Sequence, residues 1–305
     1  MSNPIDIAVP VLLPNDGWYE EYKKYNKNEH PGRIRDMGTF KYVLRSIAKN
    51  MPWINRIFII LFDKTQIPDW LNTDCPKIKV LCHKDILPPE RLPNFSSVQV
   101  DMRLSFIDEL SDNFIFINDD MFFNKPIKET DYFRDGKPVH IPSMKQVNNY
   151  NNLTKAQWGK IEFNNYDFLN RIVGQKLHFW TGHAPIPFNK TFQQFMWNKY
   201  KDEFNKKLSG SHLRADNNIC NWLFYNMEEY YRQSVNVPAN KLPARYLLQL
   251  NDRMDERTLT RMIERFPILC INDGNGVSAK GFDKVKRVVN NVLNKKYPNK
   301  SEFEK

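Results

Sequence analysis

Residues 114–123 read Phe-Ile-Phe-Ile-Asn-Asp-Asp-Met-Phe-Phe, and the fold prediction starts from this stretch. Its first four residues form a short apolar run rich in β-branched and aromatic side chains, which is typical of a strand buried on both faces. Asp119 and Asp120 follow this strand directly. Ligands of open α/β sheets bind beyond the carboxyl ends of the strands, and buried carboxylates require a cation or hydrogen bonds. We therefore predict that the two acids bind a divalent cation, and that this cation in turn binds a phosphate group. The alternatives are two solvated acids, or one acid that caps a turn.

The segments before this strand alternate between strand and helix patterns. Residues 40–51 carry apolar side chains at helical spacing up to Pro52, and Val100 begins a second such pattern after a loop that ends in two serines. Strand patterns occupy residues 5–13, 56–62 and 78–82. The order strand, helix, strand, strand, helix, strand predicts an α/β fold, with a mainly parallel Rossmann-like sheet flanked by helices.

The second half of the chain is less regular. Residues 125–180 are rich in Asn, Lys and Pro, and we expect them to form an insertion or lid within a single domain of residues 1–305. Helix patterns follow at residues 192–204 and 219–230, and residues 268–273 (ILCIND) repeat the apolar run followed by Asn-Asp. The last segment, from Phe282, has a basic amphipathic pattern. It is predicted to pack on the body of the protein, with binding to an anionic membrane surface as the alternative.

Composition limits the classes of function. The chain of 305 residues has a formal net charge of +10 and a mean hydropathy of −0.63, and it has no apolar run long enough to span a membrane. A basic balance suits an anionic partner, although a lysine-rich surface would also explain it. No nucleic-acid-binding motif is present, so a nucleotide or a membrane face is expected instead.

Cysteine and glycine usage adds two expectations. The four cysteines are scattered without a CxxC pair, which indicates neither a zinc site nor a disulfide scaffold and suits reduced thiols in the cytoplasm. The N-terminus lacks the basic region of a signal peptide, so we expect a cytoplasmic protein. With 11 glycines and no glycine-rich phosphate loop, phosphate would be held mainly by side chains and a metal.

Candidate groups for phosphoryl transfer are present. Arg35, Arg45 and Arg214 can clamp a diphosphate, although surface ion pairing is the alternative for each of them. His183, between Gly182 and Pro185, is the preferred general base, with a structural histidine as the alternative and His83 as the second choice. No serine or cysteine triad motif is recognisable.

Taken together, these motifs resemble the Stealth family of sugar-1-phosphate transferases, over nearly the whole chain. The block that carries most of the resemblance begins at Arg35-Asp36-Met37-Gly38 and ends at Asn118-Asp119-Asp120. Three further blocks appear in the expected order: residues 5–19, then His183-Ala184-Pro185 with Arg214 and Asn217-Asn218, then Cys270-Ile271-Asn272-Asp273. Residues 297–304 are similar to the tail of the family.

The resemblance implies a reaction. A UDP-linked N-acetylhexosamine or hexose would bind with a divalent metal, magnesium or manganese. A hydroxyl of a glycan or lipid-linked acceptor would attack the β-phosphorus, release UMP and form a phosphodiester in a cell-surface polysaccharide. Such an enzyme would work in the cytoplasm, or peripherally at the inner face of a bacterial plasma membrane.

The resemblance also implies roles for residues. His183, Asp120, Arg214 and Asp36 would be catalytic, and Asp119, Asp120 and Asp273 would hold the metal. Substrate-binding roles would fall to Arg35, Arg45, Asn15, Asp16, Asn118, Asn218 and Asn272. The chain departs from the family pattern at Leu13, which replaces an acid, and at Ser96, Asp101, Ser105 and Phe106. Two alternatives stay open: a metal-dependent glycosyltransferase that releases UDP, since a strand that ends in Asp-Asp suits both enzymes, and a non-catalytic glycan- or nucleotide-binding protein, which Leu13 makes plausible.

Overall fold

A computed structural model describes residues 3–26, 34–141, 156–174, 183–208, 210–274 and 276–305. Its main sheet has five strands in the order β3-β2-β1-β4-β8. The first four are parallel, and β8 pairs with β4 in the antiparallel direction. The bounds are β1 Ile5–Pro10, β2 Ile57–Leu61, β3 Ile78–Cys82, β4 Asn113–Phe116 and β8 Ile186–Asn189. The prediction of a mainly parallel α/β sheet is confirmed.

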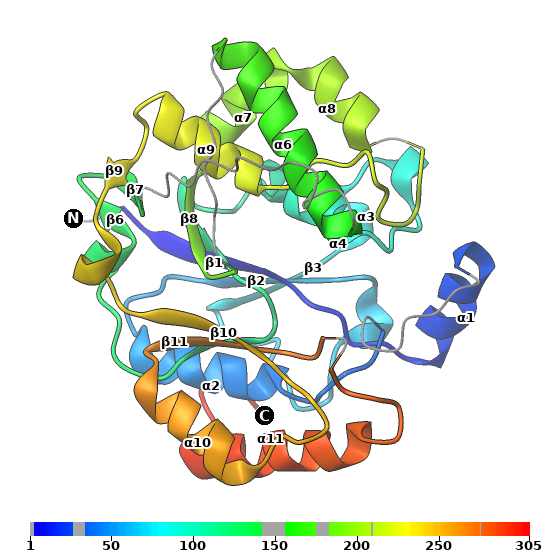
Figure 1. The fold of residues 1–305 in the computed structure, drawn as a ribbon, viewed down its shortest axis with the longest axis vertical. Coiled ribbons are helices and arrows are strands. Elements are labelled where there is room, and N and C mark those ends of the chain that lie inside the picture. Colours follow the sequence, from blue (N-terminus) through cyan, green and yellow to red (C-terminus); the bar gives the residue numbers. More distant parts are fainter. Residues whose placement is uncertain (1–2, 27–33, 142–155, 175–182, 209, 275) are drawn as a thin grey trace.

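Helices cover both faces of this sheet (Figure 1). Successive side chains of a strand point to opposite faces, so Ile7 and Val9 of β1 enter one core cluster and Ala8 enters the other. The first cluster includes residues of α2, α10 and α11, and the second includes residues of α4 and of α6 to α9. The helices are α1 Asp16–Tyr25, α2 Phe40–Asn50, α3 His83–Ile86, α4 Ser97–Asp101, α6 Gln157–Val173, α7 Lys190–Lys199, α8 Lys201–Leu208, α9 Trp222–Tyr230, α10 Glu256–Arg265 and α11 Phe282–Lys296.

A second sheet begins where the first one ends. After β4 the chain turns through Asn118, Asp119 and Asp120 and enters β5, Met121–Phe123. Strand β5 pairs antiparallel with β11, Ile268–Asn272, which pairs in parallel with β10, Arg245–Gln249. The two acids therefore lie at the crossing between two sheets, a position that the one-dimensional pattern does not reveal.

The expected insertion contains regular structure. Its described part includes β6 Phe133–Arg134, β7 Lys137–His140 and helix α6, and β7 joins β9, Val235–Asn236, in a third small sheet. The parts of the insertion at 142–155 and 175–182 lie outside the described residues. Whether this region acts as a lid within a single domain stays a prediction.

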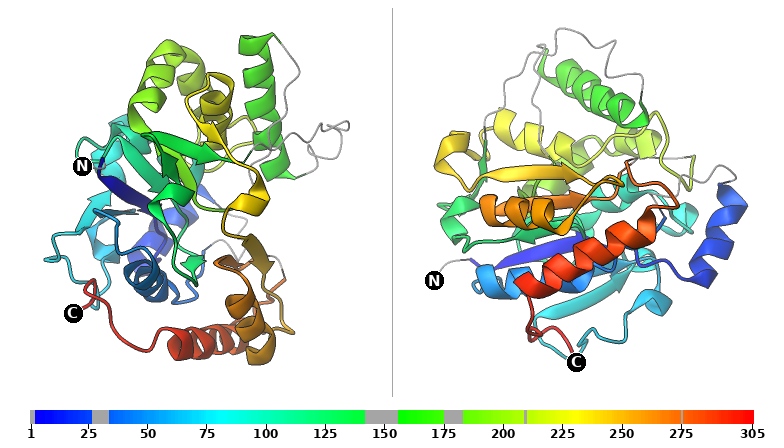
Figure 2. Two further views of the ribbon diagram at one scale, coloured as in Figure 1. Left: turned by 90° about the vertical axis from the view of Figure 1, so that its left-hand side faces the viewer. Right: turned by 60° about the horizontal axis from the view of Figure 1, so that its bottom comes forward.

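Other elements confirm or correct the sequence predictions. Helix α11 packs on the body as expected, since Val285, Val289 and Val292 are buried in the first core cluster (Figure 2). The helix predicted over 192–204 is two helices, α7 and α8. The helix pattern that begins at Val100 ends early, since α4 stops at Asp101 and a separate 3-10 turn follows at Leu104–Phe106. Within the part of the chain that the structure describes, no helix is long and apolar enough to cross a membrane.

Candidate active site

The crossing between the sheets holds two carboxyl groups in different surroundings. Oδ2 of Asp119 accepts the backbone N–H of Leu12 at 3.1 Å, so the acid is tied to the end of β1. Burial, together with the nearby charges of Asp120 and Asp36, raises the pKa of Asp119 to about 7. Such a group accepts a cation readily, because a positive charge offsets the cost of ionising it.

Asp120 is held by β11. Its backbone oxygen accepts the N–H of Ile271 at 2.9 Å, and its Oδ2 accepts the side-chain amide of Asn272 at 3.1 Å. Its Oδ1 is buried and has no hydrogen-bond partner among the described residues. Buried polar atoms are normally satisfied. This orphaned oxygen, beside the carboxylate of Asp119, fits a hard divalent cation such as magnesium or manganese.

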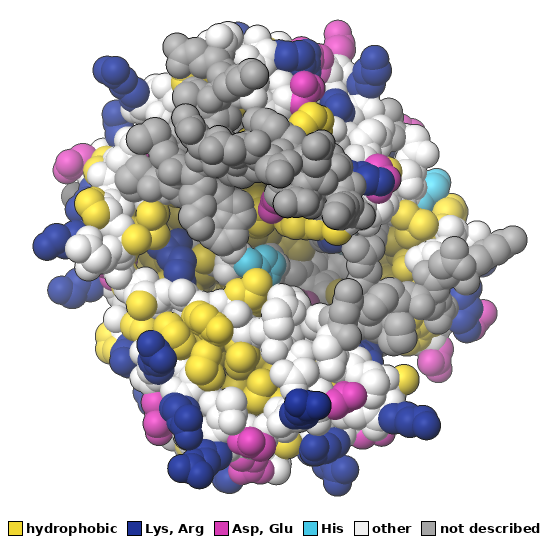
Figure 3. All heavy atoms as spheres, in the orientation of Figure 1, with side chains coloured by type: hydrophobic (Ala, Val, Ile, Leu, Met, Phe, Trp, Pro, Cys, Tyr) yellow, Lys and Arg dark blue, Asp and Glu magenta, His cyan; other side chains and the backbone are white. Residues whose placement is uncertain are grey.

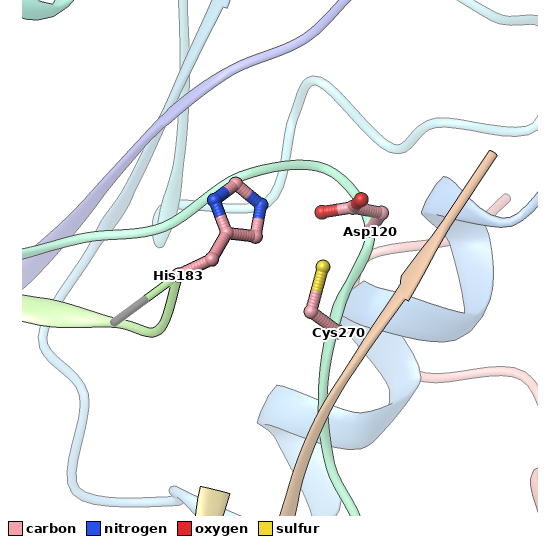
Figure 4. Close-up of side chains that lie close together, drawn as sticks. All are labelled: Asp120, His183 and Cys270. Carbon is pink, nitrogen blue, oxygen red and sulfur yellow. The ribbon is translucent and has the colours of Figure 1, made fainter. Parts of the chain in front are cut away.

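His183 lies opposite Asp120. Its Nε2 is 3.2 Å from the side-chain nitrogen of Asn118, an amide that can hold the ring in place. A nitrogen of His183, a carboxylate oxygen of Asp120 and Sγ of Cys270 all lie within 4.8 Å of one another (Figure 4). These three residues come from the loop before β8, the β4–β5 crossing and strand β11, so the fold brings together groups far apart in the chain.

A cavity of about 1080 Å³ opens beside these groups. Figure 3 shows it as a hollow in which histidine and hydrophobic side chains are visible. One side is an aromatic wall made of Trp18, Tyr22, Phe62, His83 and Phe95. The rings support one another: Trp18 stacks on Tyr22 at 4.8 Å between centroids, and Phe62 stacks on Phe95 at 5.3 Å. Burial lowers the pKa of His83 to about 4, so this imidazole is neutral near pH 7.

The other side is a tryptophan wall made of Trp158, Glu162, Trp222, Asp101 and Arg214. Trp158 meets Trp222 edge to face at 5.3 Å, and the Arg214 guanidinium lies 5.0 Å above the Trp158 ring. Nη2 of Arg214 donates to Oγ of Ser97 at 2.7 Å. Burial raises the pKa of Asp101 to about 8, although Arg214 opposes the shift, and burial raises the pKa of Glu162 to about 7. Two acids with high pKa values thus face the cavity near one cation.

The structure brings several predicted site residues together. The cavity is lined by Asn118, Asp119, His183, Arg214 and Asn272. Asp120 adjoins it through its hydrogen bond to Asn272. The negative charge of Asp36 contributes to the raised pKa of Asp119. Oδ1 of Asp36 itself accepts the backbone N–H of Gly38 at 2.7 Å. The predicted clustering therefore holds for the acids of the crossing, the histidine and Arg214.

Two predicted ligands are instead paired with each other. Arg35 donates from Nε and Nη2 to the carboxylate of Asp273 at 2.6 and 2.8 Å, and both side chains are about nine-tenths buried. A further bond runs from Arg35 to the carbonyl of Val277. The guanidinium expected at the diphosphate and the carboxylate expected at the metal thus neutralise each other. Their visible role is to tie the segment before α2 to the end of β11.

Four other predicted substrate contacts lie away from the described cavity, and their roles stay predictions. Arg45 donates twice to the buried carboxylate of Glu304, at 2.8 and 2.7 Å, and holds the C-terminal tail. Asn218 is fully buried. Its Oδ1 accepts the backbone N–H of Ala215, and its Nδ2 donates to the carbonyl of Lys207, so both bonds shape the loop that carries Arg214. Asn15 caps α1 and bonds to Thr65, and Asp16 is exposed in the first turn of that helix. Asn15, Asp16, Arg45 and Asn218 do not line the described cavity.

Sequence reasoning missed several residues of the site. Cys270 gives no metal-site signal in the sequence because no second cysteine stands near it, although it is two residues before Asn272. Glu162 and Trp158 lie one helical turn apart on α6, inside a segment that was interpreted as irregular. Asn94 is fully buried, and its carbonyl lies 3.1 Å from Nδ1 of His83. A polar residue in a loop gives no sequence signal of burial.

Comparisons with known proteins show which proteins this chain is similar to. Residues 33–140 match the family described as Stealth protein CR2, conserved region 2. The chain is 28% identical to the exopolysaccharide phosphotransferase cps2G of Lactiplantibacillus plantarum, with 100% of this chain and 98% of the relative covered. It is 29% identical to the capsular polysaccharide phosphotransferase WcwK of Streptococcus pneumoniae, over the full length of both. The capsular polysaccharide phosphotransferase fcs1 of Haemophilus influenzae is 31% identical over 72% of this chain and 64% of the relative.

Solved structures give a more distant similarity. The galactosyltransferase LgtC, in complex with donor and acceptor sugar analogs, aligns with 92% of this chain and 95% of its own at a TM-score of 0.42 and 6% identity. The α/β fold assigned here therefore rests on the sheet order and the strand pairing themselves.

Proposed function

We propose that this Stealth-family phosphotransferase transfers a sugar-1-phosphate from a UDP-sugar to a hydroxyl group of a glycan or lipid-linked acceptor and releases UMP. One observation carries the proposal: Asp119, His183 and Arg214 line one cavity, and Asp120 adjoins it through its hydrogen bond from Asn272, which is 152 residues away in the chain. Phosphoryl transfer requires positioning, neutralisation of charge and a base for the incoming hydroxyl, and these residues can supply all three. The product would be a phosphodiester in a surface polysaccharide.

In this reaction the acceptor oxygen forms a bond to the β-phosphorus of the donor, and the bond from that phosphorus to the oxygen of UMP breaks. His183 takes the proton of the acceptor hydroxyl. Asp119 and Asp120 would hold a magnesium or manganese ion, which when bound offsets the negative charge of the diphosphate. Arg214 adds a guanidinium at the cavity wall.

The two walls suit two different substrates. Leu12, Phe62 and His83 follow the carboxyl ends of β1, β2 and β3, which is where open α/β sheets bind nucleotides. The aromatic wall there offers ring faces to a uracil base. The tryptophan wall offers two indoles and carboxyl groups, which suit the faces and hydroxyl groups of an acceptor sugar. The β-phosphorus would then lie between the walls, beside Asp119 and His183.

The test is the identity of the nucleotide released. The purified protein is incubated with a panel of UDP-sugars, magnesium or manganese, and an acceptor glycan, and the products are separated by chromatography. We expect UMP together with a phosphodiester signal in the phosphorus NMR spectrum. Release of UDP without that signal would instead indicate a glycosyltransferase. Donor binding without any turnover would indicate a non-catalytic homologue.

The variant His183→Ala tests the base. We expect kcat to fall by a factor of about 100 to 10,000 because the acceptor proton loses its positioned base. His212→Ala is the matched control, since His212 contacts Pro93 and Tyr25 and does not line the cavity. Equal activity in the His183 variant and the wild type would contradict the assignment.

A further inference from the structure

We infer that Asp120, His183 and Cys270 form a binding site for zinc or another borderline transition-metal ion, and that occupation of this site blocks the proposed transfer. The inhibition depends on the proposed function, whereas metal binding does not. The three side chains offer one oxygen, one nitrogen and one sulfur atom, all within 4.8 Å of one another (Figure 4). Mixed ligands of this kind are typical of zinc, whereas magnesium takes oxygen ligands.

The spacing of the donor atoms suits a tetrahedral ion after small side-chain adjustments. With the bond lengths of zinc sites, neighbouring ligand atoms stand about 3.3 to 3.6 Å apart. The three ligand atoms lie at most 4.8 Å apart, and rotation of the His183 ring and the Asp120 carboxylate can shorten these distances by about 1 Å. Three protein ligands would leave a fourth position for water, as in open zinc sites.

Two features show that the ligands are prepared for an ion. Oδ1 of Asp120 is buried without a hydrogen-bond partner among the described residues, and a metal would satisfy it. One outer contact is also in place, because the side-chain amide of Asn272 donates to Oδ2 of Asp120 at 3.1 Å. Such secondary hydrogen bonds orient metal ligands and raise affinity.

Cys270 distinguishes this site from the hard-metal site of the two aspartates. Its side chain is 2% exposed and comes from the centre of β11, so its position is fixed by strand pairing on both sides. On binding, its thiol releases a proton to solvent and the thiolate takes the metal. A hard ion would gain little from this sulfur, whereas a zinc ion would hold Asp120 and His183 together and remove both from the transfer reaction.

The experiment is a cobalt titration of the full-length wild-type protein, because Co²⁺ reports zinc-type sites by its absorption. We expect visible bands of a tetrahedral ion together with a near-ultraviolet band from thiolate to cobalt. One equivalent of zinc should displace the cobalt and remove the visible bands and the thiolate band, whereas a large excess of magnesium should leave them unchanged. Absence of the thiolate band in the wild-type protein would overturn the proposal.

Three variants locate the site. Cys270→Ser should lose the thiolate band, and His183→Ala should weaken cobalt binding at least about tenfold, since even the loss of an outer contact costs that much. Cys220→Ser is the matched control, because Cys220 is equally buried but bonds to Asn165. If circular dichroism shows that Cys270→Ser does not fold, the cobalt affinity of His183→Ala alone tests the site. A thiolate band that persists in folded Cys270→Ser, or unchanged affinity in His183→Ala, would refute the site.

Inhibition is tested separately, with magnesium in excess. Zinc should inhibit UMP release by the wild-type protein, and Cys270→Ser should require at least about ten times more zinc for the same inhibition. Cobalt bands without any transferase activity would leave the metal site standing and remove the proposed function. Activity that zinc does not affect would refute the inhibitory role.

Discussion

Glu162 and Asp101 are protonated in part near neutral pH, because burial raises the pKa of Glu162 to about 7 and that of Asp101 to about 8. The Glu162 residue is 8% exposed, and burial raises its pKa from 4.5 to about 7, while a hydrogen bond with Trp158 opposes the shift. A carboxyl group that is partly neutral can donate a hydrogen bond as well as accept one. At the tryptophan wall, this property suits a sugar hydroxyl.

The same burial predicts a pH-dependent stability. Between pH 4.5 and about 7 the folded protein binds the Glu162 proton more tightly than the unfolded chain does, so the stability contributed by this group falls as pH rises through that range. We expect Glu162→Gln to be more stable than the wild type by about 1 to 3 kcal/mol at pH 8, and the gain to vanish near pH 4. Urea unfolding at both pH values measures it.

The control for this variant is Glu203→Gln on α8, where the carboxylate is exposed and pairs with Arg171. Its effect should stay within about 0.5 kcal/mol at either pH. A pH-independent effect of Glu162→Gln would show that packing, and not the ionisation of the carboxyl group, governs this position.

Among the elements, α2 anchors the end of the chain. Arg45 on this helix donates to both carboxylate oxygens of Glu304 and to the carbonyl of Tyr297, and the Glu304 side chain is 2% exposed. Phe303 beside it enters the core, and Leu71 forms a bridge with Glu304. The C-terminal tail is therefore part of the fold. Its packing explains its position without any role in substrate binding.

Removing one partner of this ion pair should be costly. We expect Glu304→Ala to destabilise the protein by about 3 to 5 kcal/mol, because Arg45 would remain buried without its counter-charge. Lys77→Ala is the control: it breaks the pair with Glu302, whose side chains are 35% and 53% exposed, and should cost at most about 1 kcal/mol. Guanidinium unfolding measures both variants. Similar losses in the two variants would contradict the buried-pair argument.

At the scale of the whole molecule, a net charge of +10 accompanies a surface on which Lys and Arg are widely spread (Figure 3). Helix α11 packs its apolar face inward. Its exposed side carries Lys284, Arg287 and Lys295, and Lys280 lies in the segment just before the helix. The apolar face is thus unavailable for insertion into a bilayer. We propose that any contact with the inner face of the plasma membrane, where a lipid-linked acceptor would lie, is electrostatic.

This predicts salt-sensitive binding to anionic vesicles. Each basic residue near such a surface contributes about 1 kcal/mol, and salt screens the attraction within a Debye length of about 10 Å at 0.1 M. We expect cosedimentation with phosphatidylglycerol vesicles at low salt, release at high salt, and no binding to neutral vesicles. Charge reversal at Lys280 and Arg287 should weaken it. Binding that is independent of lipid charge would contradict this interpretation.

The sequence by itself determined the parallel sheet, since apolar runs and helical periodicity are local patterns that follow from side-chain burial. The acidic motif also indicated that Asp119 and Asp120 follow a buried strand and need a compensating partner, because buried carboxylates are costly wherever the strand lies. These inferences required no knowledge of which segments meet in space.

Only the tertiary structure decided which of the charged side chains lie at the cavity. Arg35 and Arg45 have the same chemistry as Arg214, yet two of them are bound by Asp273 and Glu304 and the third faces the cavity. Likewise, Cys270 became a candidate ligand because β11 pairs with β5 and places its sulfur near Asp120 and His183. Ion pairing and metal ligation depend on distances of a few ångströms between segments more than 100 residues apart, and such distances are set by packing of the entire chain.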